Sequence, residues 1–213
     1  MAAGSRGAAR DFDELVRDVA ACRACDRMAH THALTGANGP TRARVLFVAE
    51  AVGRRGGART GVPLTRDEAG KRFERFLAIA GIDRADAFIT NAVLCNPLDA
   101  AGRNRSPAAS ETGACRPFLR RTIELVRAPV VVALGRVALE SLRAIEPHGV
   151  SLPDGALGAA RWRGRQLVAL FHPGRQSTLH RAEAAQIGDW RELGEIVRAC
   201  GRRRLAPAAH AFG

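Results

Sequence analysis

The sequence predicts an α/β fold of three layers, in which a central, mainly parallel sheet of four strands lies between helices. Four short apolar runs are spaced along the chain, and helical patterns separate them. This alternation is typical of parallel sheets, because a helix returns the chain to the edge where the next strand begins. The 213 residues suffice for one domain with one core. We expect that domain over residues 11–200, between a disordered segment (1–10) and a basic tail (201–213).

The predicted strands are near-continuous apolar runs, as expected of strands that are buried on both faces. They span residues 45–49, 87–94, 130–134 and 166–171, and a short turn at 161–165 leads into the last. The predicted helices span residues 11–21, 67–80, 110–127, 136–145 and 181–200. Asp11, Asp67 and Ser110 are candidate N-caps, because their side-chain oxygens can accept hydrogen bonds from first-turn amides. Gly81 is expected to end the second helix.

The formal net charge is +12, and Lys71 is the only lysine beside many arginines. Codon bias in a GC-rich genome can account for arginine over lysine, but not for the excess of positive charge. A strongly basic domain fits a polyanion such as nucleic acid. The chain has no run of about 20 apolar residues and no apolar signal core. We therefore expect a cytoplasmic protein with no membrane partner.

Three polar side chains are expected at one edge of the sheet. Glu50 follows the first strand, Asn91 lies in the second, and His172 follows the fourth. Ligands of parallel α/β sheets collect beyond the carboxyl ends of the strands. A carboxylate, a carboxamide and an imidazole can together bind and polarise a planar polar ligand. No Ser or Cys follows a strand in the setting of a nucleophile elbow.

The chain has five cysteines, for which metal binding, redox chemistry and simple burial are the alternatives to disulfides. Cys22 and Cys25 form a C-x-x-C pair, Cys95 follows the second strand, and Cys115 lies early in a helix. Four thiolates suit zinc or a [4Fe–4S] cluster, although the spacing of Cys95 and Cys115 does not match a zinc ribbon. The alternative is that Cys95 and Cys115 are small buried side chains without a metal. Cys200 is expected to serve only in packing.

Four segments resemble, in order, motifs of the uracil-DNA glycosylase superfamily, in the iron–sulfur branches called families four and five. The first is the C-x-x-C pair at residues 22–25. The second is AEAVG at 49–53, followed by RTGVPLTRDEAG at 59–70. The third is TNAVLCNP at 90–97, with Ser106-Pro107 and ACRPFL at 114–119. The fourth is HPGRQST at 172–178, so the resemblance covers most of the chain.

The resemblance implies a DNA glycosylase that hydrolyses the N-glycosidic bond of a deaminated base, uracil by default, and so initiates base excision repair. Such an enzyme must flip the base out of the stack. Asn91 would bind the N3/O4 edge of the base, and His172 would donate to O2, where negative charge develops. Glu50 would orient water or stabilise the cationic sugar. A structural [4Fe–4S] cluster would be held by Cys22, Cys25, Cys95 and Cys115.

The resemblance also implies a base pocket and a surface for DNA. The substrate-binding residues would be Ala51, Gly53, Leu64, Asn91 and His172. The DNA-binding residues would be Arg54, Arg55, Arg59, Arg175, Gln176 and Leu179. Leu179 would enter the space that the flipped base leaves. We expect a bacterial monomer that acts on single- or double-stranded DNA.

The chain departs from both families within these motifs. Val52 stands where both usually carry Pro, Leu64 replaces an aromatic expected to stack on the base, and Ala58 replaces a polar residue. Glu50 is typical of family four and not of family five. Because of these departures, a preferred substrate base other than uracil stays an alternative. Two other functions also stay alternatives. One is an iron–sulfur DNA-binding protein with altered catalysis that acts as a damage sensor or covalent trap, and the other is a redox iron–sulfur protein.

Overall fold

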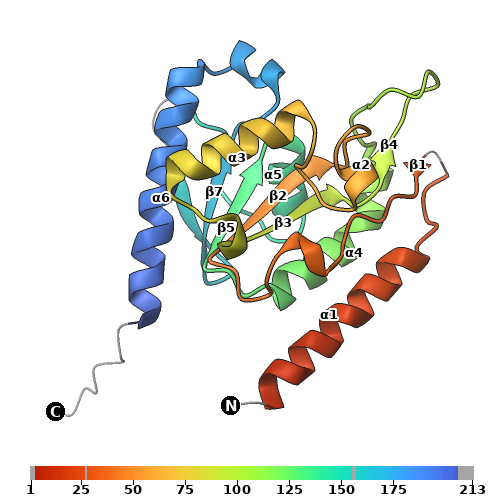
Figure 1. Cartoon of the computed structure of the whole chain (residues 1–213), viewed down its shortest axis with the longest axis horizontal. Coiled ribbons are helices and arrows are strands. Elements are labelled where there is room, and N and C mark those ends of the chain that lie inside the picture. The colour runs from red at the N-terminus through yellow and green to blue at the C-terminus, as the bar shows by residue number, and fades with distance from the viewer. Residues whose placement is uncertain (1–2, 27, 155–156, 206–213) are drawn as a thin grey trace.

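The computed structural model describes residues 3–26, 28–154 and 157–205, and a five-stranded sheet forms its centre (Figure 1). The strand order is β3-β2-β5-β7-β6. The strands span Ala87–Val93 (β3), Val45–Ala51 (β2), Val130–Leu134 (β5), Arg165–Leu170 (β7) and Ala159–Trp162 (β6). All pairs among β3, β2, β5 and β7 are parallel, which confirms the predicted mainly parallel sheet.

The sheet has five strands where the sequence predicted four, because residues 159–162 form β6. This strand pairs antiparallel with β7, and Trp162 lies opposite Arg165. The two residues between them have positive φ, 48° for Arg163 and 74° for Gly164, as tight hairpins require. Arginine rarely adopts such a φ, so the local sequence gave only a turn signal and not a strand pair.

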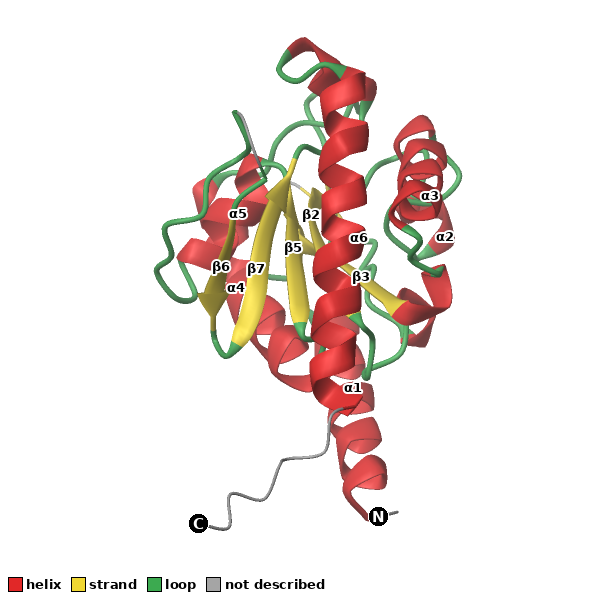
Figure 2. Cartoon of the chain, turned by 90° about the vertical axis from the view of Figure 1, so that its left-hand side faces the viewer, coloured by secondary structure: helices red, strands yellow, loops and turns green. Residues whose placement is uncertain are grey.

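Helices cover both faces of the sheet, which confirms the three layers (Figures 1 and 2). In the described part of the chain they are α1 (Ala3–Ala21), α2 (Gly57–Thr60), α3 (Glu68–Ala80), α4 (Ala109–Leu125), α5 (Arg136–Arg143) and α6 (Glu183–Leu205). One apolar cluster joins α3 and α6 to the sheet, and a second joins α1, α4 and α5 to its other face. Among the described helices, none has the length and hydrophobicity needed to cross a membrane.

The helix ends agree with the sequence at some positions and differ at others. Asp67 caps α3 by accepting a hydrogen bond from the Gly70 amide (2.9 Å), and Gly81 ends the helix at φ 64°. Ser110 is not the cap of α4, because it lies inside the first turn, where Glu111 accepts from the Ala108 amide (2.7 Å).

Both termini of the predicted domain also differ from the expected bounds. α1 begins at Ala3 and not at Asp11, so residues 3–10, expected to be disordered, are helical. Several of these residues are alanines, which have the highest intrinsic helix propensity. At the other end α6 continues to Leu205, and residues 206–213 of the predicted tail lie outside the described residues.

A small second sheet holds the segment after α1 beside the end of β3. Its strands β1 (Met28–Ala29) and β4 (Asn96–Pro97) pair antiparallel. Between them, Asn38 donates from Nδ2 to the Ile89 carbonyl of β3 (2.7 Å). This pairing joins two segments almost 70 residues apart in sequence, a contact that no local pattern encodes.

Trp190 is the centre of the aromatic packing between α3, α6 and the sheet. Its ring stacks on Phe76 (5.2 Å between centroids) and on Phe47 (5.7 Å) and meets Phe73 edge-on. The side chain is fully buried. The segments that lead into α3 and α6 flank the cavity described below. The aromatic cluster therefore sets the positions of the two helices next to that cavity.

We expect Trp190→Ala to lower the free energy of unfolding by about 3–5 kcal/mol, since it leaves a large cavity among three aromatic rings. Chemical denaturation followed by circular dichroism measures the change. The neighbouring Arg191 is exposed, so Arg191→Ala should change stability by no more than about 0.5 kcal/mol. Equal effects of the two substitutions would contradict this account of the core.

Candidate functional site

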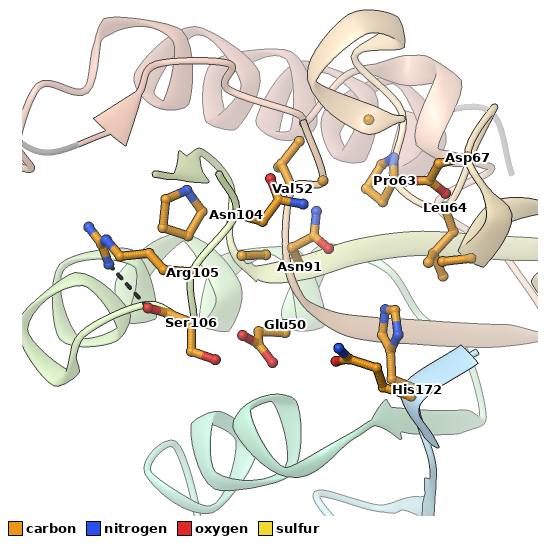
Figure 3. Close-up of a pocket in the computed structure, with 16 residues that line it drawn as sticks. Glu50, Val52, Pro63, Leu64, Asp67, Asn91, Asn104, Arg105, Ser106 and His172 are labelled. Carbon is orange, nitrogen blue, oxygen red and sulfur yellow. Dashed lines mark hydrogen bonds between the residues drawn. The ribbon is translucent and has the colours of Figure 1, made fainter. Parts of the chain in front are cut away.

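A cavity of about 380 Å³ opens at the carboxyl ends of the parallel strands (Figure 3). Glu50 near the end of β2, Asn91 in β3 and His172 just after β7 all line it. The register of β2 and β3 places Ala49 opposite Asn91, so Glu50 lies one residue further along the strand pair than Asn91, and both residues line the cavity. The structure therefore assembles the three polar side chains that the sequence placed at this edge.

Two loops complete the walls of the cavity. The segment from the end of β2 to the first turn of α3 contributes Ala51, Val52, Gly53, Gly57, Pro63, Leu64, Asp67 and Ala69. The rest of the chain contributes Pro97, Asn104, Arg105, Ser106 and Gln176. All the predicted substrate-binding residues are included. The sequence did not single out Asn104, Arg105 and Ser106 as site residues, although Ser106-Pro107 belonged to a recognised motif. Ala58 is absent from the lining residues that the structure describes.

Asn91 carries a buried amide nitrogen that lacks a partner. The residue is 1% exposed, and its Nδ2 atom makes no hydrogen bond with any described residue. Leaving a buried donor unsatisfied costs about 1–3 kcal/mol. Because the side chain projects into the cavity (Figure 3), a ligand that offers an acceptor there would remove this penalty.

The orientation of the His172 ring fixes the position of its proton. The backbone amide of Gly174 donates to Nδ1 (3.0 Å), so Nδ1 is the acceptor and Nε2 carries the hydrogen of the neutral ring. Burial lowers the pKa of His172, and the charge of Asp67 opposes this shift. Protonation at Nδ1 would also set two donors against each other. His172 thus presents a neutral ring that donates through Nε2.

The segment after His172 is braced from α3 and α6. Arg72 donates from Nε to the Pro173 carbonyl (2.9 Å), and its guanidinium packs over the ring of Phe76. Further along, Arg181 forms two hydrogen bonds of 2.6 Å with the buried carboxylate of Asp189. These contacts hold both ends of the segment, so the position of His172 is set by the helices behind it.

The loop after β2 is folded tightly against the start of α3. Leu64 and Arg66 have left-handed φ values of 54° and 65°. A Cβ atom on Gly70 would lie 2.9 Å from the Leu64 backbone, so only glycine fits there. A non-glycine residue in this conformation is strained by about 1–3 kcal/mol, and the surrounding contacts must maintain it. The close packing against Gly70 thus holds Leu64 at the cavity wall despite this strain.

The predicted DNA-binding residues surround the cavity without all touching it. Arg54, Arg55 and Arg175 line a second hollow of about 400 Å³, which shares Asp67 and Asn104 with the first. Gln176 lines the first cavity itself. Arg59 is exposed on α2, and it is not among the described residues that line the cavity or the second hollow. Leu179 is 81% exposed, whereas most large apolar side chains of the described residues are buried. The segment that carries it is held in place by the contacts described above.

The predicted metal ligands come together at the second sheet. Cys25, Cys95 and Cys115 pack with Met28 and Val93 in a small apolar cluster. Burial raises the pKa of the Cys115 thiol to about 11, and the charges of the other three cysteines act in the same direction. Metal ligation requires the thiolate, so a bound cation would reverse this shift. Cys200 instead lies on α6 and packs against the apolar cluster between α3, α6 and the sheet, as expected.

A Cys/His group that could hold a metal ion also lies here. Ligand atoms of His30, His32 and Cys95 lie within 4.8 Å of one another. Nε2 of His32 is 3.0 Å from the Cys22 carbonyl, an arrangement that would leave Nδ1 free to act as a ligand. The sequence gave no signal for this group, because His30 and His32 reach Cys95 only through the β1–β4 pairing.

The mainly parallel sheet and the polar cavity at its carboxyl edge are also the features of a known class of proteins. Residues 37–193 match the model of the uracil DNA glycosylase superfamily, and the chain belongs to this superfamily. A type-4 uracil-DNA glycosylase of Archaeoglobus fulgidus is 32% identical over 91% of this chain and 95% of its own length. One from Thermotoga maritima is 32% identical over 71% and 76% of the two chains. A type-5 uracil-DNA glycosylase of Thermus thermophilus is 28% identical over 79% and 89%.

The pKa of His172 can be measured by NMR titration of its ring, and we expect a value below the ordinary 6.5. Replacing Asp67 by Asn should lower it further, because the carboxylate charge that opposes the shift is lost. Asn is also a good N-cap, so α3 should keep its start. The matched control is Glu68→Gln, which removes the next carboxylate along the chain and should leave the titration unchanged. A rise in the pKa of His172 in the Asp67 variant would contradict the electrostatics.

Proposed function

We propose that this protein is a monofunctional DNA glycosylase that excises uracil from DNA by hydrolysis of the N-glycosidic bond, the first step of base excision repair. The unpartnered amide of Asn91 carries the proposal, because it shares a cavity with the Nε2–H donor of His172 and the carboxylate of Glu50. Membership of the superfamily and the names of the relatives support the same reaction.

The cavity suits one extruded base. Its volume of about 380 Å³ lies in the range of small-ligand sites, and a base can enter only after it leaves the duplex stack. A carboxamide can accept from N3–H of uracil and donate to O4, which would satisfy the orphaned Nδ2 of Asn91. Leu64 at the wall offers the base an apolar contact in place of aromatic stacking.

His172 and Glu50 are suited to the charges that develop as the glycosidic bond breaks. The base leaves as an anion, and a fixed Nε2–H donor aimed at O2 stabilises that charge. The lowered pKa of His172 keeps the ring neutral, so the proton stays on the enzyme. The negative charge of Glu50 would stabilise the cationic sugar or orient the attacking water.

Water, rather than an amine, is the proposed nucleophile. Lys71 is the only lysine of the chain, and it lies on α3 in an ion pair with Glu68 (2.7 Å). It is not one of the described residues that line the cavity. A Schiff-base intermediate therefore has no amine at the site, which supports a monofunctional enzyme. Because Glu50, Asn91 and His172 come from one chain, we propose that a monomer is sufficient.

The basic hollow beside the cavity is the proposed contact with the DNA backbone. Arg54, Arg55 and Arg175 line it together with the carboxylates of Asp67 and Glu68, so arginines outnumber acids by three to two. Arginines bind phosphate oxygens with paired donors. Arg59 and Gln176 would extend this contact. Leu179 would fill the space of the extruded base, since its side chain is exposed while the segment that carries it is held by Arg181 and Asp189.

A structural [4Fe–4S] cluster on Cys22, Cys25, Cys95 and Cys115 is the proposed cofactor. The donor set fits, because Cys25, Cys95 and Cys115 pack in one apolar cluster and Cys22 is close enough for its charge to act on Cys115. Four thiolates can hold such a cluster, and its positive iron centres would offset the rise in pKa that burial causes at Cys115. The cluster would tie the N-terminal segment to β3 and α4. Those elements flank the 97–106 loop, whose residues Asn104 and Ser106 line the cavity.

Asn91→Ala and His172→Ala should each lower the rate of uracil release by roughly 10²–10³, the usual loss for one transition-state donor. The assay uses labelled single- and double-stranded oligonucleotides that contain uracil, hypoxanthine, xanthine or 5-hydroxymethyluracil, followed by alkaline cleavage of abasic sites. His180→Ala, an exposed histidine of the same segment, is the control and should act like the wild type. Binding without release of any of these bases would instead favour the damage sensor or trap.

Cys115→Ser should lose iron and the visible absorbance of the cluster, whereas Cys200→Ser should keep both. Iron and acid-labile sulfide are measured directly, so the result does not depend on activity. A His30→Ala, His32→Ala variant separates the two possible ligand sets and should retain the cluster. Loss of bound metal in that variant, with zinc in place of iron in the wild type, would overturn the four-cysteine assignment.

A further inference from the structure

A second basic hollow lies at the amino ends of the strands, at the opposite end of the sheet from the cavity. Its volume is about 360 Å³, and four arginines line it: Arg127, Arg161, Arg163 and Arg165. Among the described residues that line this hollow, none is acidic. Neither the sequence motifs nor the proposed glycosylase reaction gives these arginines a role.

Segments far apart in sequence build this hollow. Arg127 follows α4, Arg165 begins β7, and Arg161 and Arg163 belong to the β6–β7 hairpin. The end of α6 closes one side at Cys200, and Figure 2 shows this end of the helix at the same end of the sheet as the hairpin. A Cβ atom on Gly201, the residue after Cys200, would lie 3.3 Å from the guanidinium of Arg44, which forms an ion pair with Asp86 (3.3 Å).

Positive side chains line the hollow, and one of them is preorganised. Arg165 donates to the Ile123 and Val126 carbonyls (2.7 Å each), which fixes its guanidinium. Among the described residues, Glu124 and Glu146 lie beside Arg163 (3.2 and 3.3 Å). Arg161 also lines the hollow, and it is exposed.

We infer that this hollow binds phosphate groups, and that they belong to a second segment of DNA. Planar guanidinium groups match phosphate oxygens in geometry as well as in charge. Strands of this length span roughly 17–20 Å, so one straight duplex held over the carboxyl ends does not reach the amino ends. The protein would hold two DNA segments on opposite ends of its sheet and pass from one to the other. The inference concerns binding and does not rest on base release.

Bridging of two uracil-free duplexes, one with a donor and one with an acceptor fluorophore, tests the inference. We expect energy transfer with the wild-type protein, and sedimentation should give complexes of one protein with two duplexes. Arg127→Glu with Arg161→Glu should need at least about tenfold more protein for the same transfer. The dependence of log affinity for the second duplex on log salt should become shallower by about two.

The matched control is Arg17→Glu with Arg191→Glu, two exposed arginines on α1 and α6. It makes the same change in net charge and should bridge like the wild type. Equal loss in the control, full bridging by the hollow variant, or no bridging by the wild type would each overturn the inference. If the double variant unfolds, Arg161→Gln, at an exposed position, should give a smaller loss in the same direction.

Two competition arms identify the source of the phosphate. Added inorganic phosphate and a nucleoside monophosphate should compete only weakly, because neither supplies the several adjacent phosphates of a duplex. Loss of bridging at low concentrations of the nucleotide, but not of inorganic phosphate, would assign the hollow to a free nucleotide and overturn the assignment to DNA.

Discussion

Parallel pairing of β2, β3, β5 and β7 is the constraint on which the rest of the structure depends. Because these strands share one direction, all their carboxyl ends meet at one edge, and the chain must cross over the sheet after each strand. This shared direction brings the side chains of Glu50, Asn91 and His172 to a common cavity. The same constraint gathers the amino ends, where arginines of the connections form the second hollow.

The site is rigid because each of its loops is held by a different part of the frame. Asp67 caps α3 and lies against the loop after β2, Arg72 holds Pro173, and the small β1–β4 sheet ties the 97–106 loop to the N-terminal segment. A donor can stabilise developing charge only if it is already oriented. The orphaned amide of Asn91 and the neutral ring of His172 are the result of that bracing, and their cost in stability is carried by the core.

The positive charge of the chain is divided between two ends of the molecule. The hollow beside the cavity has Arg54, Arg55 and Arg175, and the other has arginines of the β6–β7 hairpin and of the loop before β5. In the two proposals above, the first hollow would hold the DNA that undergoes base excision, and the second would hold a separate segment of DNA.

The sequence by itself determined the α/β class, the four parallel strands, the cap at Asp67 and the set of polar residues at the sheet edge. These features follow from local patterns. A strand buried on both faces is an apolar run, and a helix start needs a side chain that accepts hydrogen bonds from its unpaired amides. Only the tertiary structure decided the β6 strand, the place of Asn104 in the cavity wall and the approach of His32 to Cys95. Each of these rests on contacts between distant segments, or on a positive φ at an arginine, and neither leaves a periodic signal in the chain.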